Sequence, residues 1–315
     1  MSNVFRSIEA IPHNFGPSVV AIGNFDGVHR GHQQILKAVA DHAAQIGAKA
    51  IAITFDPHPE RFLHPEHAPA LLSPMKERIR LLLQAHVDAV LVLPFALELA
   101  QLTAREFVQR VLVRGLQTRG VHEGGNFRFG HKAEAGVQEL AVLGAEFGFT
   151  VTVHEPVCVH GLEVSSSAVR AQIAAGDMKR TRWMLGRPFG VRGTPIRDRG
   201  IGAKLLVPTV NLAPYEGLLP AHGVYVTRLS IADHCFHAVS NVGVRPTFEA
   251  AGFSVETHIL NFEPVEIGED TPLYLEFLSR LRGEHKFAGP AELKQQILRD
   301  VARARRYFRL AEPAL

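Results

Sequence analysis

Two histidines and three glycines lie close together in the segment GNFDGVHRGH, residues 23–32. His29 and His32 are three residues apart, so both side chains would project together from the first turn of a helix. Gly23 and Gly27 let the backbone approach a phosphate closely, and the start of a helix supplies free N–H groups and a positive dipole. Two imidazoles at that point can donate hydrogen bonds to a phosphate whose negative charge grows as a bond breaks. The segment therefore predicts a phosphate site whose chemistry needs no nucleophile from the protein.

We expect the turn before the first histidine to contact the phosphate or nucleotide through Gly23, Asn24, Phe25, Asp26 and Gly27. Two other interpretations of the histidine pair stay open, namely helix capping and a partial zinc site. Further histidines follow in the sequence at His58, His64 and His67. Zinc sites usually have three or four ligands at a recognisable spacing, and this region has no cysteine, so phosphate binding is the favoured interpretation.

A second candidate phosphate contact precedes a predicted helix that ends at Gly176. Three serines stand at its start, namely Ser165, Ser166 and Ser167. Their hydroxyls and the free N–H groups of the helix converge on one point, and Arg170 lies one turn further on. An ordinary serine N-cap explains the serines when they are taken alone. Together with the histidine pair in the same domain, they favour phosphate binding.

Polar residues in the second half of the chain suggest a different reaction. Thr209 and Asn211 are two apart on a predicted strand, so their side chains point to one face. A hydroxyl and an amide carbonyl facing together can hold Mg²⁺, with phosphate oxygens and waters completing its shell. Glu256 can accept the proton of an attacking hydroxyl. Polar side chains are also routine on the solvated face of a strand, and this alternative stays open.

A glycine-rich, basic segment, RGTPIRDRGIGAK, precedes this strand at residues 192–204. Such a composition suits a loop that covers phosphates. Its candidate nucleotide contacts are Gly193, Gly202 and Lys204.

Alternating strand and helix signals must position the first set of residues. Apolar runs at residues 19–25, 48–55, 88–95 and 149–157 predict buried strands, and helical periodicity fills the segments between them. Ser73 and Thr103 are predicted N-caps, the second with a capping box closed by Glu106. Continuous apolar strands alternating with helices predict an α/β domain over residues 1–184, a parallel sheet with helices on both faces.

From about Leu185 the pattern changes to short β-rich runs bounded by Gly and Pro. These runs cover residues 205–212, 223–230, 236–242, 255–262 and 273–281. Several short strands separated by turns predict an antiparallel barrel or sandwich over residues 185–315. Helical periodicity returns at residues 290–308 and predicts a C-terminal helix.

Composition excludes several other classes of protein. The 315 residues fit two domains, and 46% hydrophobic with 21% charged residues indicates a chain that buries real cores. The net charge of +3 is not concentrated anywhere, which argues against nucleic-acid or membrane-surface partners. No signal-peptide pattern and no apolar run of about 18 residues is found, so we expect a cytoplasmic protein. We expect Cys158 and Cys235 to be buried free thiols. A homo-oligomer is left open.

The segment GNFDGVHRGH resembles the HxGH signature of the nucleotidyltransferase superfamily. In its full length it is similar to the adenylyltransferase half of prokaryotic bifunctional FAD synthetases, the riboflavin kinase/FMN adenylyltransferases. Further similar blocks follow in order, TFDPHP at 54–59, GNFRFG at 125–130 and SSSAVR at 165–170. The riboflavin kinase half resembles this chain at PTVN (208–211), GVY (223–225), NVGVRPTF (241–248) and VETH (255–258). The resemblance covers almost the whole chain.

The resemblance implies a Rossmann-like nucleotidyltransferase domain followed by a riboflavin-kinase-like β-barrel with a C-terminal helix. It implies that ATP phosphorylates riboflavin to FMN, and that a second ATP adenylylates FMN to FAD with release of pyrophosphate. Mg²⁺ would serve both reactions. His29, His32 and Glu256 would be catalytic, and Thr209 and Asn211 would bind the metal. The implied flavin contacts are Asp56, Pro57, His58, Asn126 and Arg128.

The chain departs from the family pattern at a few positions. Asn126 stands where many members have Asp, and Ser167 stands in place of Thr. Leu206 and Val207 replace a Gly-Phe pair, and Ile267 replaces the Tyr of a Tyr-Gly pair. Three alternatives stay open beside the bifunctional enzyme: an FMN adenylyltransferase with an inactive kinase domain, a flavin carrier or sensor without catalysis, and a nucleotidyltransferase with another phosphorylated acceptor.

Overall fold

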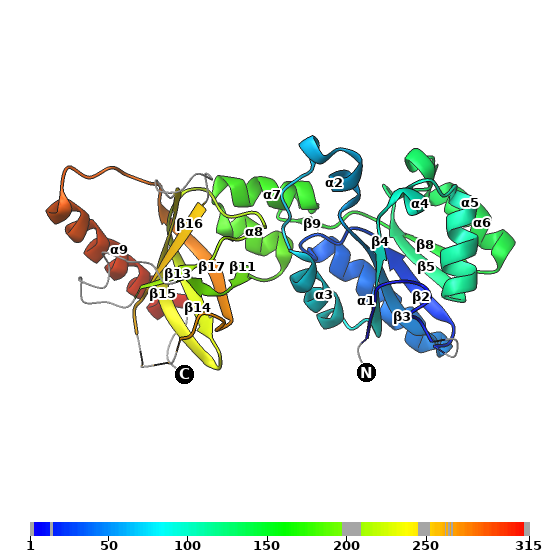
Figure 1. Ribbon diagram of the computed structural model, residues 1–315, viewed down its shortest axis with the longest axis horizontal. Helices are drawn as coiled ribbons and strands as arrows, with labels where there is room; N and C mark the ends of the chain where they lie inside the picture. Colours follow the sequence, from blue (N-terminus) through cyan, green and yellow to red (C-terminus); the bar gives the residue numbers. More distant parts are fainter. Residues whose placement is uncertain are drawn as a thin grey trace. The chain divides into compact units, whose positions relative to one another are not determined.

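A computed structural model shows the chain divided into two compact units, Met1–Ser166 and Ser167–Leu315 (Figure 1). The structure describes residues 3–12, 15–196, 209–244, 253–261, 263, 265 and 267–311. The domain boundary expected near Met184 stays a prediction. Two helices, α7 (Ser166–Ala175) and α8 (Met178–Leu185), lie between that position and the division of the units.

The first unit contains a six-stranded parallel sheet in the order β1-β4-β3-β2-β5-β8. Its strands are β1 (Val4–Phe5), β2 (Ser18–Ile22), β3 (Lys49–Asp56), β4 (Ala89–Pro94), β5 (Thr118–Gly124) and β8 (Thr150–His154). β2 pairs with β3 on one side and with β5 on the other, so the direction of winding reverses at β2. Open α/β sheets bind ligands at such a reversal, beyond the carboxyl ends of the strands.

Helices cover both faces of this sheet, which explains why β2, β3 and β4 are largely apolar runs. α1 (Arg30–Ile46) and α3 (Met75–Gln84) cover one face through Leu36 and Leu82. The other face packs against α5 (Ala104–Phe107), the π-helical η2 (Val108–Gly115) and α6 (Val137–Phe147). Truncating a fully buried leucine such as Leu36 to alanine costs about 2–5 kcal/mol, so both layers contribute strongly to stability.

Short elements occupy the connections of the first unit. They are α2 (Pro59–Leu63), η1 (Pro65–His67), α4 (Leu97–Ala100), β6 (Arg128–Phe129), η3 (His131–Ala133), β7 (Ala135–Gly136), β9 (Cys158–Val159) and β10 (Leu162–Glu163). The predicted capping box of Thr103 and Glu106 is confirmed. The prediction of Ser73 as an N-cap is wrong: the cap of α3 is Pro74, and the Ser73 hydroxyl bonds to the turn after β2 instead. Cys158 and Cys235 are exposed, which corrects the expectation of buried thiols.

The second unit contains a seven-stranded antiparallel sheet in the order β11-β17-β14-β15-β16-β13-β12. Its strands are β11 (Phe189–Gly193), β12 (Pro195–Ile196), β13 (Thr209–Leu212), β14 (Gly223–Ile231), β15 (His234–Val244), β16 (Phe253–Ile259) and β17 (Leu273–Arg282). The C-terminal helix α9 (Pro290–Ala311) packs on β14 and β15 through Ala304 and Phe308 (Figure 1). Within the described ranges, no helix combines the length and apolar character needed to cross a membrane.

The register of this sheet aligns one residue from each of five strands. Asn211 of β13 lies opposite Glu256 of β16, and Glu256 lies opposite Asn241 of β15. Asn241 lies opposite Val224 of β14, which in turn pairs with Arg282 of β17. Residues directly opposite one another share a face, so the register places these five side chains together on the face that α9 covers.

Candidate active sites

The turn between β2 and α1 is held by hydrogen bonds from three other segments. The carboxylate of Asp26, which is 1% exposed, accepts from the backbone N–H groups of Leu72 and Ser73 at 2.9 Å each. Arg78 Nη2 lies 3.5 Å from the same carboxylate. The Thr54 hydroxyl donates to the carbonyl of Asn24 at 3.2 Å. The Asp26 side chain therefore anchors the turn, and its contact with a nucleotide stays a prediction.

Three residues of the turn adopt left-handed backbone conformations, Phe25 (φ 47°), Gly27 (φ 80°) and Val28 (φ 40°). A branched side chain rarely adopts this conformation, which costs about 1–3 kcal/mol. A Cβ at Gly27 would lie 2.8 Å from Leu72 Cδ1, so only glycine fits there. The anchored turn thus fixes its backbone N–H groups before any ligand binds.

The two histidines stand at the start of α1 with their rings stacked, 3.6 Å between centroids. His29 is the N-cap, and its Nδ1 accepts from the backbone N–H of His32 at 3.4 Å, which confirms the capping interpretation for this residue. A neutral imidazole that accepts at Nδ1 carries its proton on Nε2. The edge of Phe25 packs on the His32 ring.

Burial lowers the pKa of His32 well below its ordinary value, and His29 and Arg78 lower it further. His32 is therefore neutral at pH 7. The residue is partly exposed, but its Nδ1 is buried and has no hydrogen-bond partner among the described residues. An uncharged imidazole held in this way can donate a hydrogen bond without first gaining a proton.

Two of the three serines predicted for the first site belong to the first unit. Ser166 Oγ donates to the carbonyl of Asp26 at 3.0 Å, and Ser165 is partly buried. Ser167 and Arg170 belong to the second unit, so their phosphate contacts stay predictions. Within the described residues of the chain, no group of three or more His, Cys, Asp or Glu is arranged to hold a metal ion.

The predicted flavin contacts of the first unit follow the ends of β3 and β5. Asp56 and Pro57 are exposed, whereas His58 is buried and caps α2 by accepting from Glu60 N at 3.2 Å. Asn126 and Arg128 are exposed, and the Arg128 guanidinium donates to the carbonyl of Ala133. The carboxyl ends of parallel strands meet at one edge of a sheet, so these residues share an edge with the histidine turn.

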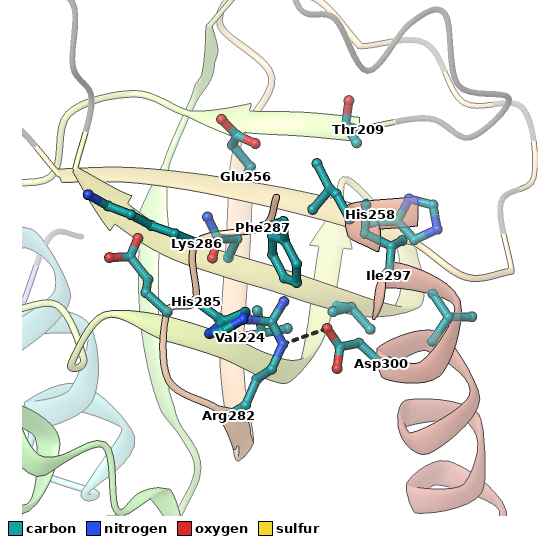
Figure 2. Close-up of a pocket in the computed structure, with 15 residues that line it drawn as sticks. Thr209, Val224, Glu256, His258, Arg282, His285, Lys286, Phe287, Ile297 and Asp300 are labelled. Atoms are coloured by element: carbon teal, nitrogen blue, oxygen red, sulfur yellow. Dashed lines mark hydrogen bonds and ion pairs between the residues drawn. The ribbon is translucent and has the colours of Figure 1, made fainter. Parts of the chain in front are cut away.

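A cavity of about 800 Å³ lies between the sheet of the second unit and α9 (Figure 2). Strand residues, the segment after β17 and one face of α9 line it. The lining is Thr209, Val224, Val239, Asn241, Glu256, His258, Arg282, Glu284, His285, Lys286, Phe287, Leu293, Ile297, Asp300 and Val301. Small-molecule sites commonly have volumes of about 300–1,000 Å³, so the cavity suits a ligand of that size.

The predicted kinase residues come together at one side of this cavity. Thr209 and Glu256 both line it, and Figure 2 shows them on neighbouring strands. Thr209 and Asn211 also line an adjoining cavity of about 210 Å³. Asn211 Oδ1 is buried and has no hydrogen-bond partner among the residues described. A buried oxygen without a donor is a favourable ligand for a hard cation, so the residues present fit Mg²⁺.

On the opposite side of the cavity, the positively charged Arg282 side chain is held beside the ring of Phe287. Arg282 Nε donates to Asp300 Oδ2 at 2.9 Å, and Gln296 donates to the other oxygen of that carboxylate at 2.9 Å. Asp300 is only 2% exposed. The Arg282 guanidinium lies 5.6 Å from the centre of the Phe287 ring. From the sequence alone, Arg282 and Asp300 are pocket or structural residues, and the two roles are not separated because their proximity depends on how α9 packs.

Sequence analysis missed other lining residues of the cavity. Asn241 is brought to Glu256 by strand register, which no local spacing reveals, whereas His258 lies two residues after Glu256 on the same face of β16. The pKa of His258 is lowered by burial first and by Arg305 second. His285 and Lys286 belong to the segment after β17 that closes the cavity.

The structure describes the glycine-rich segment before β13 only through Ile196. Gly202 and Lys204 lie outside the described residues, as do Leu206 and Val207. Gly193 ends β11, where a Cβ would lie 3.1 Å from Leu212 Cδ1.

One chain therefore combines an α/β unit that carries the histidine turn with a β-barrel unit that holds a cavity of ligand size. This combination defines a two-domain transferase class. The family model of FAD synthetase matches residues 11–168, and that of riboflavin kinase matches residues 185–308.

Curated relatives match over nearly their whole length. The chain is 37% identical over 300 residues to a bifunctional riboflavin kinase/FMN adenylyltransferase from Pseudomonas fluorescens, covering 93% of this chain and 95% of the relative. It is 33% identical over 297 residues to the protein of that description from Escherichia coli K12, covering 94% of each chain. The chain belongs to the bifunctional riboflavin kinase/FMN adenylyltransferase family.

A solved structure entitled macrolide-efflux protein, from Streptococcus pneumoniae, has the same fold. Its TM-score is 0.86 at 26% sequence identity, with 96% of this chain and 98% of that chain covered.

Proposed function

We propose that this chain makes FMN and then FAD at two separate sites, one in each unit. Family membership makes it a bifunctional transferase of flavin cofactor biosynthesis. The β-barrel unit transfers the γ-phosphoryl group of ATP to riboflavin, and the α/β unit transfers the AMP part of a second ATP to FMN. One observation supports this proposal most directly. Each of the two segments matched by a family model has its own group of polar side chains, namely the stacked histidines in the first and Glu256 with Thr209 in the second.

In the adenylyl transfer, a phosphate oxygen of FMN attacks the α-phosphorus of ATP, and the bond to the β-phosphate breaks. The turn after β2 and the start of α1 bind the phosphates through backbone N–H groups. His29 and His32 donate hydrogen bonds to oxygens whose charge grows as pyrophosphate leaves. Because His32 is neutral, this stabilisation needs no imidazolium and should persist above pH 7.

In the kinase reaction, the terminal ribityl hydroxyl of riboflavin attacks the γ-phosphorus and ADP leaves. Glu256 accepts the proton of that hydroxyl. Thr209 and Asn211 hold Mg²⁺, which when bound neutralises charge on the transferring phosphate oxygens. Phe287 and the apolar face of α9 supply the surface against which an aromatic flavin ring can pack.

The same proposal takes riboflavin, FMN and ATP as small-molecule partners and keeps the expected cytoplasmic location. Asn126 and Arg128 are the proposed contacts for FMN, and Ser165 to Arg170 are the proposed contacts for nucleotide phosphate.

The test is to incubate the pure protein with riboflavin, ATP and Mg²⁺ and to separate the flavins by chromatography. We expect FMN to appear first and FAD to follow. Unchanged riboflavin, with added FMN still converted to FAD, would show an inactive kinase domain. No conversion of either flavin would overturn the proposal and favour a carrier.

A further inference from the structure

A buried carboxyl group in the first unit has no role in the reaction as derived so far. Glu123 lies near the end of β5 and is 3% exposed. Its Oε1 accepts a hydrogen bond of 2.6 Å from the backbone N–H of Ile22, the last residue of β2. Carboxyl groups are rarely buried without a charged partner, so this one calls for an explanation.

The bond to Ile22 stands where the pairing of β2 with β5 stops. The two strands are in register through Ser18, Val19 and Val20, the last opposite Val121. On its other side β2 stays paired with β3 to the end, and Gly23 N still donates to Ile53 O at 3.0 Å. Ile22 N–H therefore faces β5 after the backbone ladder has ended, and the Glu123 side chain supplies the acceptor.

This point is the reversal of strand order, where a crevice opens in sheets of this kind. Gly23 follows Ile22 directly and begins the turn that carries His29 and His32. A displacement of Ile22 would be passed to that turn, and a misplacement of about 1 Å can reduce a rate about a hundredfold.

The surroundings of Glu123 favour the uncharged acid. Burial raises the pKa of Glu123 well above its ordinary value, and only the Ile22 N–H opposes this. β2 has no titratable residue, and the neighbouring His122 bonds to His42 and His154.

On the helices that pack against this face, the charged side chains that the structure describes are exposed to solvent. η2 and α6 present apolar residues such as Val108 and Leu140 to the sheet. The charged residues of α5, η2 and α6 are exposed, namely Arg105, Glu106, Arg110, Arg114, Glu139 and Glu146. In the adjoining turn, Asp26, His29 and His32 make no contribution to the shift in the pKa of Glu123.

We propose that Glu123 is a positioning residue for adenylyl transfer, which fixes the end of β2 across the crevice and thereby the start of the histidine turn. The inference rests on the proposed adenylyl transfer at this turn. Ionisation at high pH would place an uncompensated charge beside the turn, so FAD formation should decline as the carboxyl loses its proton.

Two substitutions separate the hydrogen bond from the charge. Glu123→Gln keeps an acceptor for Ile22 N–H but cannot ionise, whereas Glu123→Val removes the acceptor. Conversion of FMN to FAD is measured from pH 6 to pH 10 in the full chain, with FMN formation from riboflavin as the internal reference. Val121→Ala, one step earlier on the same face of β5, is the matched control for loosening the strand.

We expect Glu123→Gln to stay within about threefold of the wild-type rate at pH 7 and to lose the alkaline decline of FAD formation. Glu123→Val should lower kcat for FAD formation about 10- to 100-fold, with FMN formation unchanged. Val121→Ala should keep the alkaline decline. The proposal is overturned if Glu123→Gln shows the wild-type decline, or if Glu123→Val forms FAD at the wild-type rate.

Thermal unfolding checks the protonation state even if Glu123→Val does not fold. Because the pKa of the folded carboxyl is raised above that of the unfolded one, wild-type stability should decrease as pH rises above the unfolded pKa. Glu123→Gln should therefore have a higher Tm than wild type at pH 7, and this advantage should vanish near pH 4. An equal Tm difference at both pH values would contradict an uncharged Glu123. Loss of FAD formation in wild type itself would instead refute the proposed function.

Discussion

The two candidate sites are built in opposite ways. The first is one continuous turn, in which Asp26 and the stacked pair His29 and His32 already bond or pack within the protein. The second is a cavity lined by residues of several strands, of the segment after β17 and of α9, and Asn211 Oδ1 has no donor in the described structure. The geometry of the first site depends on the anchoring of one turn, whereas the geometry of the second depends on how separate strands and a helix pack together.

This difference indicates that FMN formation and FAD formation depend on separate parts of the chain. Changes in the histidine turn should abolish one activity through a few local atoms. Substitutions in the cavity should lower the kinase activity by different amounts. The decrease should be largest for side chains that contact the phosphate or the metal directly.

The largest effect is expected for His29→Ala combined with His32→Ala. Each lost donor to the developing charge costs about 10²–10³ in rate, so conversion of FMN to FAD should fall about 10⁴-fold or more. Formation of FMN from riboflavin should stay within about twofold. His67→Ala, at an exposed histidine outside the turn, is the control. FAD formation within tenfold of wild type would show that the pair is not catalytic.

Glu256→Gln should produce the reverse pattern with a somewhat smaller effect. Loss of a general base costs about 10²–10⁴ in rate, so initial rates of FMN formation should drop by about 10³ while added FMN is still converted to FAD. Glu216→Gln, at an exposed glutamate outside the cavity, is the matched control. If Glu256→Gln phosphorylates riboflavin normally, the base must be sought elsewhere in the cavity.

A more graded effect is expected for Asn211→Ala. Removing the buried Oδ1 should raise the Mg²⁺ concentration that half-saturates FMN formation about tenfold, because the cation loses one oxygen ligand. Titration of both activities with Mg²⁺ measures this, and the Mg²⁺ dependence of FAD formation should not move. A shift of equal size in both activities would argue for a metal site shared between them.

The smallest effect concerns stability in the first unit. Three histidines form a chain of hydrogen bonds, with His42 Nδ1 2.9 Å from His122 Nε2 and His122 Nδ1 3.0 Å from His154 Nε2. Burial, with contributions from His154 and His42, lowers the pKa of His122 to about 4. The folded state therefore binds fewer protons than the unfolded one, and stability is lost as pH falls from about 6.5 toward 4.

We expect this loss to reach about 1–2 kcal/mol, after allowing for solvent screening. Melting curves between pH 7.5 and pH 4.5 measure it, with His122→Val as the comparison. The variant should show a flatter dependence of Tm on pH than wild type. Parallel curves for the two proteins would assign the acid sensitivity to other groups.

The contrast between the sites also explains what could be predicted from the sequence. Local spacing determines the histidine turn and the alternation of strands and helices, so both the α/β class and the position of His29 at a helix start followed from the sequence alone. Thr209 and Glu256 were found as residue types in similar motifs. Their proximity, and the participation of Asn241, depend on the pairing of β13, β16 and β15, which spacing along the chain does not encode.

One wrong prediction and one residue that was not identified have a similar origin. Ser73 precedes a proline and a helix, so the local pattern predicted a cap, but bonding to Asp26 and Gly27 uses its hydroxyl instead. Glu123 stands in β5, whose sequence TRGVHEG is not an apolar run, and it gave no signal because its partner is a backbone N–H group distant in sequence. Hydrogen bonds between segments distant in sequence can thus replace a locally predicted bond, as at Ser73, or leave no local pattern, as at Glu123.

The most direct test of two independent sites is to mix the two inactive variants. Neither the His29→Ala/His32→Ala protein nor the Glu256→Gln protein should convert riboflavin to FAD alone, although the second should convert added FMN. Together with riboflavin, ATP and Mg²⁺ they should form FAD, because FMN made by the first protein diffuses to the second. Failure of the mixture to form FAD, while the Glu256→Gln protein still accepts added FMN, would contradict two separate sites.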